Sequence, residues 1–337
     1  MPRTVCHPPP VRRALLPLLA AVTTAAAAGC GTAGVRKRPP PAEPARSPAL
    51  HATPAGHVVP VGTAPEALAA DAVAHVLAVA VHGPDRLVLV DARTGRAAHT
   101  VALPADPRHP AGAARPAVFV VPAEAGAHAL AITPGDRPHD AAVVAGRTFV
   151  ADARSGTVSV LDRGRRSAGF RVATRPGGLA GVDAERALAV VSLRERVVEL
   201  YDPHTLKRIA RAPAGAGPTH VVADGDRLFV ADTGGGALLV FRTRPKLRLT
   251  RRVGLPGSPY GMAIDPIRHR LWVTLTARNE LVALPAHGRP RVMRRLPTVR
   301  QPDAVAVDAA LGIVAVAGRS AGVLQLIGRD QAYPDDH

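Results

Sequence analysis

A repeat of about 40 residues runs through positions 138–301, and it constrains the fold more than any other feature of the chain. The sequence RTFVAD at 147–152 recurs 80 positions later as RLFVAD at 227–232, with weaker copies at 186–191 and 270–274. Each copy is a short apolar run followed by a turn rich in Gly, Pro or Asp, which is typical of β-strands joined by hairpins. A period of this length with several strands per repeat predicts a β-propeller.

Seven repeats are expected from the positions at which the pattern restarts. The restarts fall near Pro65, Pro107, Pro138, Gly178, Pro218, Pro259 and Pro302. The second repeat, 107–137, is short and the least regular. The chain is therefore predicted to be all-β, a seven-bladed β-propeller with four-stranded antiparallel blades.

The last repeat provides three strands, at 304–307, 312–317 and 323–327, before the chain ends. The segment 57–61, ahead of the first repeat, resembles a fourth strand. We expect this N-terminal strand to complete the last blade, because pairing the two ends removes an exposed sheet edge. The propeller would span 57–330, with 331–337 as a tail.

Three stretches carry a family resemblance. The stretch 157–162 (TVSVLD) follows 149–152 (FVAD), and 87–95 (LVLVDARTG) and 197–205 (VVELYDPHT) match the same strand and turn. Over about 65–328 the chain resembles the YVTN-type propeller repeat, and its Val-Ala-Asp is similar to the related NHL repeat. The resemblance implies an extracytoplasmic binding or scaffold protein, with a minority of lactonases and lyases in these families.

The N-terminus has the three-part layout of a secretory signal: arginines in 2–13, an apolar or small stretch at 14–28, and Ala-Ala-Gly before Cys30. The stretch is too short for a mature transmembrane helix. These residues resemble the bacterial lipoprotein signal, which implies removal of 1–29 and lipidation of Cys30. The resemblance therefore implies an extracytoplasmic protein, lipid-anchored to the outer face of the bacterial cytoplasmic membrane.

Residues 30–56 are rich in Pro, Ala and Arg and have no apolar periodicity, so a disordered stalk is expected behind the anchor. The other cysteine, Cys6, would leave with the signal. No disulfide is then expected in the mature chain.

The net charge of +17 comes almost wholly from arginine. Such a charge attracts anionic lipids or cell-wall polymers, although a high-GC genome also favours arginine codons. No run of five basic residues and no aromatic-plus-basic platform occurs, so a nucleic-acid partner is not expected.

The first strand of each blade lines the central channel of a propeller, and its opening residues face the mouth. The polar residues at these openings are His139, Asp140, His220, Tyr260 and Asp303. Imidazole and carboxylate groups together bind divalent metals or act as acid and base. The alternative is that they hydrogen-bond to backbone and water, and several openings are only Gly or Ala.

Other motifs point to structure. Asp152 and Asp232 precede turns and are expected to cap them. The 14 histidines show no metal-ligand spacing, and those in turns, such as His269 and His287, are expected to be solvated. No nucleophile elbow or phosphate-binding loop is present.

Together these features predict a monomeric, membrane-anchored binding or scaffold propeller for an envelope protein or an anionic wall or membrane ligand, without a cofactor. The alternative is an enzyme, a metal-assisted lactonase, hydrolase or lyase. It would use His220, Asp140 and His139 at the channel mouth, with a divalent metal as the accompanying option.

Overall fold

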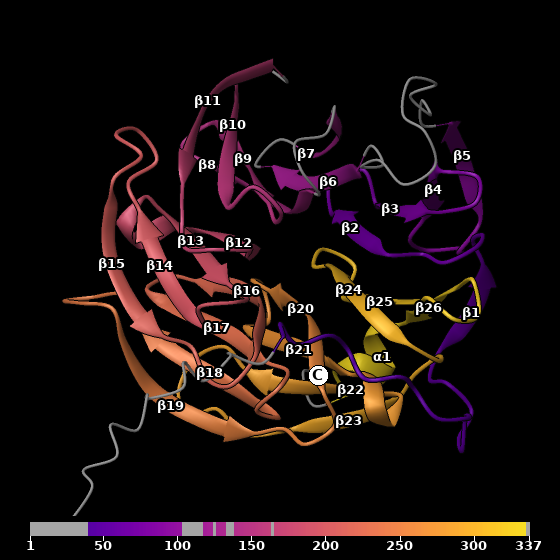
Figure 1. Cartoon of the computed structure of the whole chain (residues 1–337). Coiled ribbons are helices and arrows are strands. Elements are labelled where there is room, and N and C mark those ends of the chain that lie inside the picture. The colour runs from indigo at the N-terminus through magenta and orange to yellow at the C-terminus, as the bar shows by residue number, and fades with distance from the viewer. Residues whose placement is uncertain (1–39, 103–116, 124–125, 133–137, 163–164, 335–337) are drawn as a thin grey trace, which may run out of the picture. The chain divides into compact units, whose positions relative to one another are not determined.

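The computed structural model describes residues 40–102, 117–123, 126–132, 138–162 and 165–334. Nearly all regular structure in this part is β-strand (Figure 1). The helical segments there are η1 (Asp183–Glu185), η2 (Thr276–Arg278) and α1 (Arg329–Ala332). At three or four residues each, none of them is long enough to cross a bilayer.

The described strands form six four-stranded sheets, five of them in simple chain order. These five are β2 (Ala67–Asp71), β3 (Val76–Val81), β4 (Arg86–Asp91), β5 (Ala97–Ala102); β8 (Pro138–Val144), β9 (Arg147–Asp152), β10 (Thr157–Asp162), β11 (Arg165–Arg171); β12 (Pro176–Val182), β13 (Ala187–Ser192), β14 (Val197–Tyr201), β15 (Arg208–Pro213); β16 (Pro218–Asp224), β17 (Arg227–Asp232), β18 (Ala237–Arg242), β19 (Arg248–Gly254); and β20 (Pro259–Asp265), β21 (Arg270–Leu275), β22 (Glu280–Pro285), β23 (Arg294–Pro297).

The sixth four-stranded sheet joins the two ends of the described chain. It contains β24 (Pro302–Asp308), β25 (Ile313–Gly318), β26 (Val323–Ile327) and β1 (His57–Pro60) in the order β1-β26-β25-β24. The pairing is antiparallel and places His57 opposite Leu326 and Pro60 opposite Val323. The prediction that the N-terminal strand completes the last blade is confirmed.

The first strand of each blade packs against the first strands of its neighbours. Contacts run from β2 to β24, β20, β16, β12 and β8 in turn, as expected for blades arranged around an axis (Figure 1). A further sheet of two strands, β6 (Ala117–Ala123) and β7 (Gly126–Ile132), contacts β2 and β8. The chain is a β-propeller with four-stranded antiparallel blades.

The predicted count of seven blades is wrong, because the strands in the described part of the chain form six four-stranded blades. The error lies in the second repeat, 107–137. Within the described residues this repeat provides only the hairpin β6–β7. At 31 residues, this repeat is shorter than the others, which have about 40 residues for four strands and their turns.

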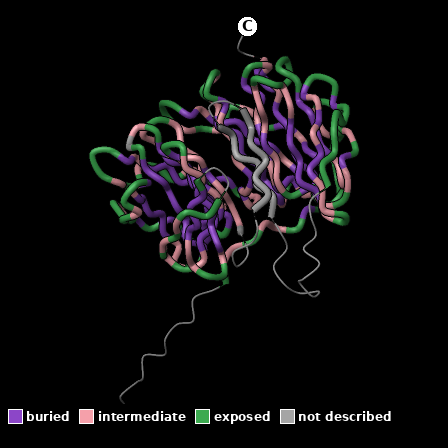
Figure 2. Tube along the Cα trace, turned by 90° about the horizontal axis from the view of Figure 1, so that it is seen from above, coloured by how far each residue is buried: buried purple, intermediate pink, exposed green. Residues whose placement is uncertain are grey.

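The core lies between the blades, where buried residues form bands along the strands and exposed residues mark the turns (Figure 2). Phe149, Phe229 and Trp272 take equivalent places in the second strands and are fully buried. The predicted tail also contributes. Tyr333 is buried, and its hydroxyl accepts a hydrogen bond from Trp272 Nε1 at 3.0 Å.

Residues 40–56, hereafter the strap, depart from the predicted disordered stalk. The strap (indigo in Figure 1) forms hydrogen bonds with Ser258 between β19 and β20, with Thr276 after β21, and with Gln325 in β26. Ser47 is buried and donates to Thr276 O at 2.6 Å, and Ala55 N donates to Pro297 O at 2.9 Å. Small and proline-rich sequence lacks periodicity, yet it can lie in extended form against loops whose polar groups match its backbone. Residues 1–39, including the predicted signal peptide and Cys30, lie outside the described residues.

Candidate functional site

The opening residues of the inner strands sit on irregular backbone. Five inner strands change register against the second strand of their blade, whereas β2 does not. The shifts lie between Pro138 and Asp140, between Pro176 and Leu179, between Pro218 and Val221, between Pro259 and Met262, and between Pro302 and Ala304. Each shift places one extra residue on the inner strand. Such a bulge re-aims side chains near the strand end.

Three of the five predicted site residues form a row of rings. The ring centroids of His139 and His220 are 6.0 Å apart, and Tyr260 meets His220 edge-on at 4.4 Å. His139 and His220 belong to β8 and β16, which are separated by β12. Two side chains from non-adjacent blades meet only where both point toward the axis. We call His139, His220, Tyr260 and Asp303 the mouth cluster.

A glycine on the intervening blade makes the approach of the two histidines feasible. A Cβ atom added to Gly178 would lie 2.8 Å from His220 Cα and from Val221 N, closer than real Cβ contacts come. Any side chain there would push β12 away from β16. The glycine therefore sets the spacing between the blades at the site.

His220 is the most unusual member of the mouth cluster. Its Nδ1 is buried, and no group in the described part of the chain forms a hydrogen bond with it. Burial, and secondarily the charge of His139, lowers the pKa of His220 to about 3. The imidazole is therefore neutral at neutral pH, with one nitrogen able to accept or donate a hydrogen bond depending on the tautomer.

Tyr260 and Asp303 continue the cluster. Burial, followed by the negative charges of Asp303 and of Glu43 in the strap, raises the pKa of Tyr260. Burial also raises the pKa of Asp303 to about 6, although a hydrogen bond from Gln301 and the charge of Arg319 act against the rise. Asp303 Oδ2 lies 3.8 Å from an Arg319 guanidinium nitrogen. The carboxyl group of Asp303, the phenol of Tyr260 and the neutral imidazole of His220 are thus neighbours in the cluster, in this order.

Asp140, in contrast, does not present its carboxylate to the cluster. Asp140 Oδ1 accepts from Ala141 N and Oδ2 accepts from Leu179 N, both at 2.8 Å. The second bond crosses from β8 to β12. Burial raises the pKa of this carboxyl group to about 7 despite these donors. Asp140 is a link between two blades, as the structural alternative expects.

The turn aspartates also serve the fold. Asp232 Oδ1 accepts from Ala216 N, Gly217 N and Gly235 N at 2.7–3.1 Å. Asp152 Oδ2 accepts from Ser159 Oγ at 2.6 Å. Asp232 therefore caps the turn that follows it, as predicted, whereas the carboxylate of Asp152 joins β9 to Ser159 in β10.

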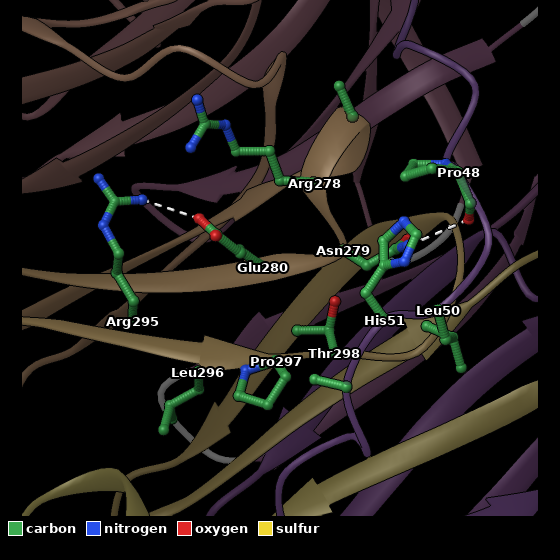
Figure 3. Close-up of a pocket in the computed structure, with 12 residues that line it drawn as sticks. Pro48, Leu50, His51, Arg278, Asn279, Glu280, Arg295, Leu296, Pro297 and Thr298 are labelled. Atoms are coloured by element: carbon green, nitrogen blue, oxygen red, sulfur yellow. Dashed lines mark hydrogen bonds and ion pairs between the residues drawn. The ribbon is translucent and has the colours of Figure 1, made fainter.

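A pocket of about 540 Å³ lies between the strap and the blade β20–β23. In Figure 3, Pro48 and His51 of the strap face Arg278 and Arg295 of the blade across it. Asn279 Nδ2 donates to Pro48 O at 3.1 Å, while Asn279 Oδ1 is buried without a hydrogen-bond partner among the described residues. This pocket was not predicted from the sequence, because four of its twelve lining residues belong to the segment expected to be disordered.

The ligand atoms required for a metal are not gathered at the mouth cluster. Within the described ranges, no group of three His, Cys, Asp or Glu ligands that includes a mouth residue comes within 4.8 Å. The rings and the carboxyl group of the mouth cluster are suited instead to hydrogen bonding, to stacking and to proton transfer.

No family model and no curated protein sequence matches this chain. Solved structures do match it in shape. A streptogramin B lyase has a TM-score of 0.63 and 12% identity over 80% of this chain and 97% of that one. The β-propeller domain of Myceliophteria thermophila Cps50 (Swd1) has a TM-score of 0.64 and 11% identity over 81% and 99%. Virginiamycin B lyase from Staphylococcus aureus has a TM-score of 0.62 and 11% identity over 80% and 98%.

Identities this low show the fold and nothing further about chemistry. The similar structures include two named as lyases and one propeller domain not named as an enzyme. On its strand topology and on these similarities, the chain is a β-propeller.

Proposed function

We propose that this chain is an extracytoplasmic ligand-binding propeller, anchored through Cys30, that takes its ligand at the mouth cluster on the strap side. The observation that carries the proposal is His220. A buried ring nitrogen without a hydrogen-bond partner among the described residues is costly, and a ligand group could satisfy it. Tyr260 and His139 flank this nitrogen's ring with flat surfaces suited to a ring-bearing or hydroxyl-bearing ligand.

The charge of the chain supports an anionic cell-envelope component or a loop of an envelope protein as the ligand. Arg319 reaches Asp303 from the adjacent turn, and the pocket arginines Arg278 and Arg295 lie on the same strap side. Imidazole, phenol and guanidinium groups together donate hydrogen bonds to phosphate, carboxylate or sugar oxygens.

Binding is tested by titrating soluble peptidoglycan fragments and anionic wall polymers into the purified chain and measuring heat. His220→Ala should weaken binding at least tenfold, whereas His204→Ala, an exposed turn histidine, should not. Arg278→Ala, in the pocket beside the strap, distinguishes the two sites: it should weaken binding only if the ligand binds in the pocket. Equal binding by the wild type and His220→Ala would refute a site at the mouth cluster.

The anchor is tested separately by feeding cells an alkyne-bearing palmitate. Cys30→Ser should abolish labelling and release the chain from membranes. Cys6→Ser is the matched control, because this cysteine lies within the predicted signal. Labelling that survives Cys30→Ser would contradict the anchor.

A second candidate is an acid–base enzyme, favoured by the spatial succession of the His220, Tyr260 and Asp303 side chains. The carboxyl group of Asp303, with a pKa raised to about 6, is closer to neutral pH than an ordinary carboxyl group and suits proton transfer, while the imidazole of His220, with a pKa lowered to about 3, stays neutral and can hydrogen-bond to a substrate. The fold similarity to two lyases is consistent with such chemistry by analogy alone. Turnover of a cyclic ester or a streptogramin B that is lost in both His220→Ala and Asp303→Asn would favour this candidate over simple binding.

A further inference from the structure

Away from the mouth cluster, three side chains with metal-ligating atoms converge at the other end of the strands. They are Asp224, His269 and His287, each offering one ligand atom, and these atoms all lie within 4.8 Å of one another. Asp224 ends β16, and His269 lies in the turn between β20 and β21. Because successive turns of an antiparallel blade alternate between its two ends, this turn lies opposite the β21–β22 turn that contacts the strap.

The backbone around the three side chains is fixed by hydrogen bonds. Ala286 N donates to His269 O at 2.8 Å, which joins the two histidine-bearing segments. Arg227 donates to Ala286 O at 2.9 Å and to Gly288 O at 3.1 Å, on either side of His287. Arg227 lies directly opposite Asp224 in the register of the β16–β17 hairpin. The same arginine therefore connects the segment that carries Asp224 to the segment that carries His287.

The turn that carries His269 is also rigid. Asp265 Oδ1 accepts from Ile267 N at 2.9 Å and from Arg268 N at 3.0 Å. His269 itself takes a left-handed conformation with φ of 50°. Such a backbone is unusual outside glycine and persists only where the surroundings hold it. The imidazole is therefore presented from a fixed turn.

The side chains already contact one another. His287 Nε2 lies 2.8 Å from Asp224 Oδ2, and the rings of His269 and His287 meet edge-on with centroids 4.5 Å apart. Asp224 is half-buried and both histidines are exposed, so an ion can reach them from solvent. An ordinary ion pair would explain the contact of Asp224 with His287, but it does not require the second histidine.

We propose that Asp224, His269 and His287 form a binding site for a divalent first-row transition ion such as Zn²⁺. Two imidazoles and one carboxylate match the preferences of Zn²⁺, and three protein ligands leave a fourth position open to water or to a group from a partner. The site is independent of the proposed function, because it lies on different strand ends and shares no residue with the mouth cluster.

The test uses the full chain without an affinity tag, dialysed against chelator and titrated with Zn²⁺ while heat is measured. One ion per chain is expected, together with a rise in melting temperature that EDTA reverses. Because even the partners of metal ligands contribute about 10–100-fold to affinity, each of Asp224→Asn, His269→Ala and His287→Ala should weaken binding at least about tenfold.

Two controls keep the outcome decisive. His220→Ala and His204→Ala should bind Zn²⁺ like the wild type, and in chelator all the variants should melt cooperatively as the wild type does. Loss of binding in His220→Ala would assign the ion to the mouth cluster and overturn the proposal. So would binding that is unchanged in all three ligand variants, or a loss of stability in His287→Ala with no dependence on Zn²⁺ in any variant.

Discussion

Gln301, the residue before β24, donates a hydrogen bond from Nε2 to Asp303 Oδ1 of the mouth cluster at 3.0 Å. The same Nε2 donates to Ala45 O at 3.1 Å, and Gln301 Oε1 accepts from Ser47 N at 3.0 Å. One side chain therefore joins the strap to a buried carboxyl group of the candidate site. A ligand that changed the position or charge of Asp303 would change the packing of the strap.

Gln301→Ala should release the middle of the strap. The change removes the side-chain bonds to Ala45 and Ser47, and each net hydrogen bond is worth about 1 kcal/mol. We expect faster proteolysis and faster amide exchange in the strap, with a loss of unfolding free energy of about 1–3 kcal/mol. Gln331→Ala, at an exposed position, is the control. A strap equally protected in both variants would contradict this role of Gln301.

Gly178→Ala should disturb the mouth cluster without touching its side chains. The new methyl group would lie 2.8 Å from His220 Cα, so β12 and β16 must separate, at a cost of about 1–3 kcal/mol. Gly254→Ala on β19 meets nothing within 4 Å and should be nearly neutral. Chemical denaturation measures both. Similar denaturation midpoints for the two variants would contradict this prediction, because they would show that β12 and β16 can separate at little cost in free energy.

His220→Gln should flatten the dependence of stability on acid pH. Burial lowers the folded-state pKa of His220 from 6.5 to about 3, so between these values the unfolded chain binds the extra proton. The wild type therefore loses stability as the pH falls from about 6.5 toward 3, by about 1.4 kcal/mol for each unit of pKa shift at most.

A glutamine cannot take up that proton, so the difference between wild type and variant should shrink or change sign over this range. Denaturant midpoints measured at several pH values give the comparison. His99→Gln, on the exposed face of β5, provides the control. Parallel pH profiles for wild type and His220→Gln would mean that the imidazole is better solvated than its burial indicates.

Asp140→Ala should destabilise the propeller more than Asp140→Asn. Alanine leaves both Ala141 N and Leu179 N without their acceptor, at about 1–3 kcal/mol for each buried donor. Asparagine keeps one acceptor oxygen and the size of the side chain. Thermal unfolding ranks the two variants. Ligand binding or turnover lost in Asp140→Asn at full stability would instead return this residue to the functional site.

The repeat predicted the blade and its closure because both follow from local pattern. Strands such as 147–152 and 227–232 carry their alternation and their turns within one repeat, and the strand at His57–Pro60 carries the pattern of an outer strand. The blade count failed where that pattern is weakest, at 107–137. A short repeat gives no local signal of how many strands it completes.

The arrangement of the candidate site residues was predicted only in part, for a different reason. Strand openings placed His139, His220, Tyr260 and Asp303 at one end of the inner strands, but sequence position alone could not separate Asp140 from them. That distinction depends on Leu179 N, which belongs to the next blade. The one sign in the sequence was the pair Gly177 and Gly178, because residues without side chains in β12 leave room for His139 and His220 to approach each other.

The convergence of Asp224, His269 and His287 could not be predicted from spacing. The three residues belong to two blades and to separate turns, and they meet through packing of β16 against β20. Metal motifs recognised in sequences usually lie within one helix or one hairpin.

The order of the strap was not predicted, because it depends on hydrogen-bond acceptors and donors in distant parts of the chain.

The pairing of β1 with β26 bears on when this molecule can finish folding. Ala55, next to β1, accepts a hydrogen bond from Gln325 Nε2, 270 residues further along. During synthesis the early strand must wait, unpaired, until β26 has emerged. Contacts of such high sequence separation form late and slowly. If the chain is exported, the closing step falls to the compartment that receives it rather than to the ribosome.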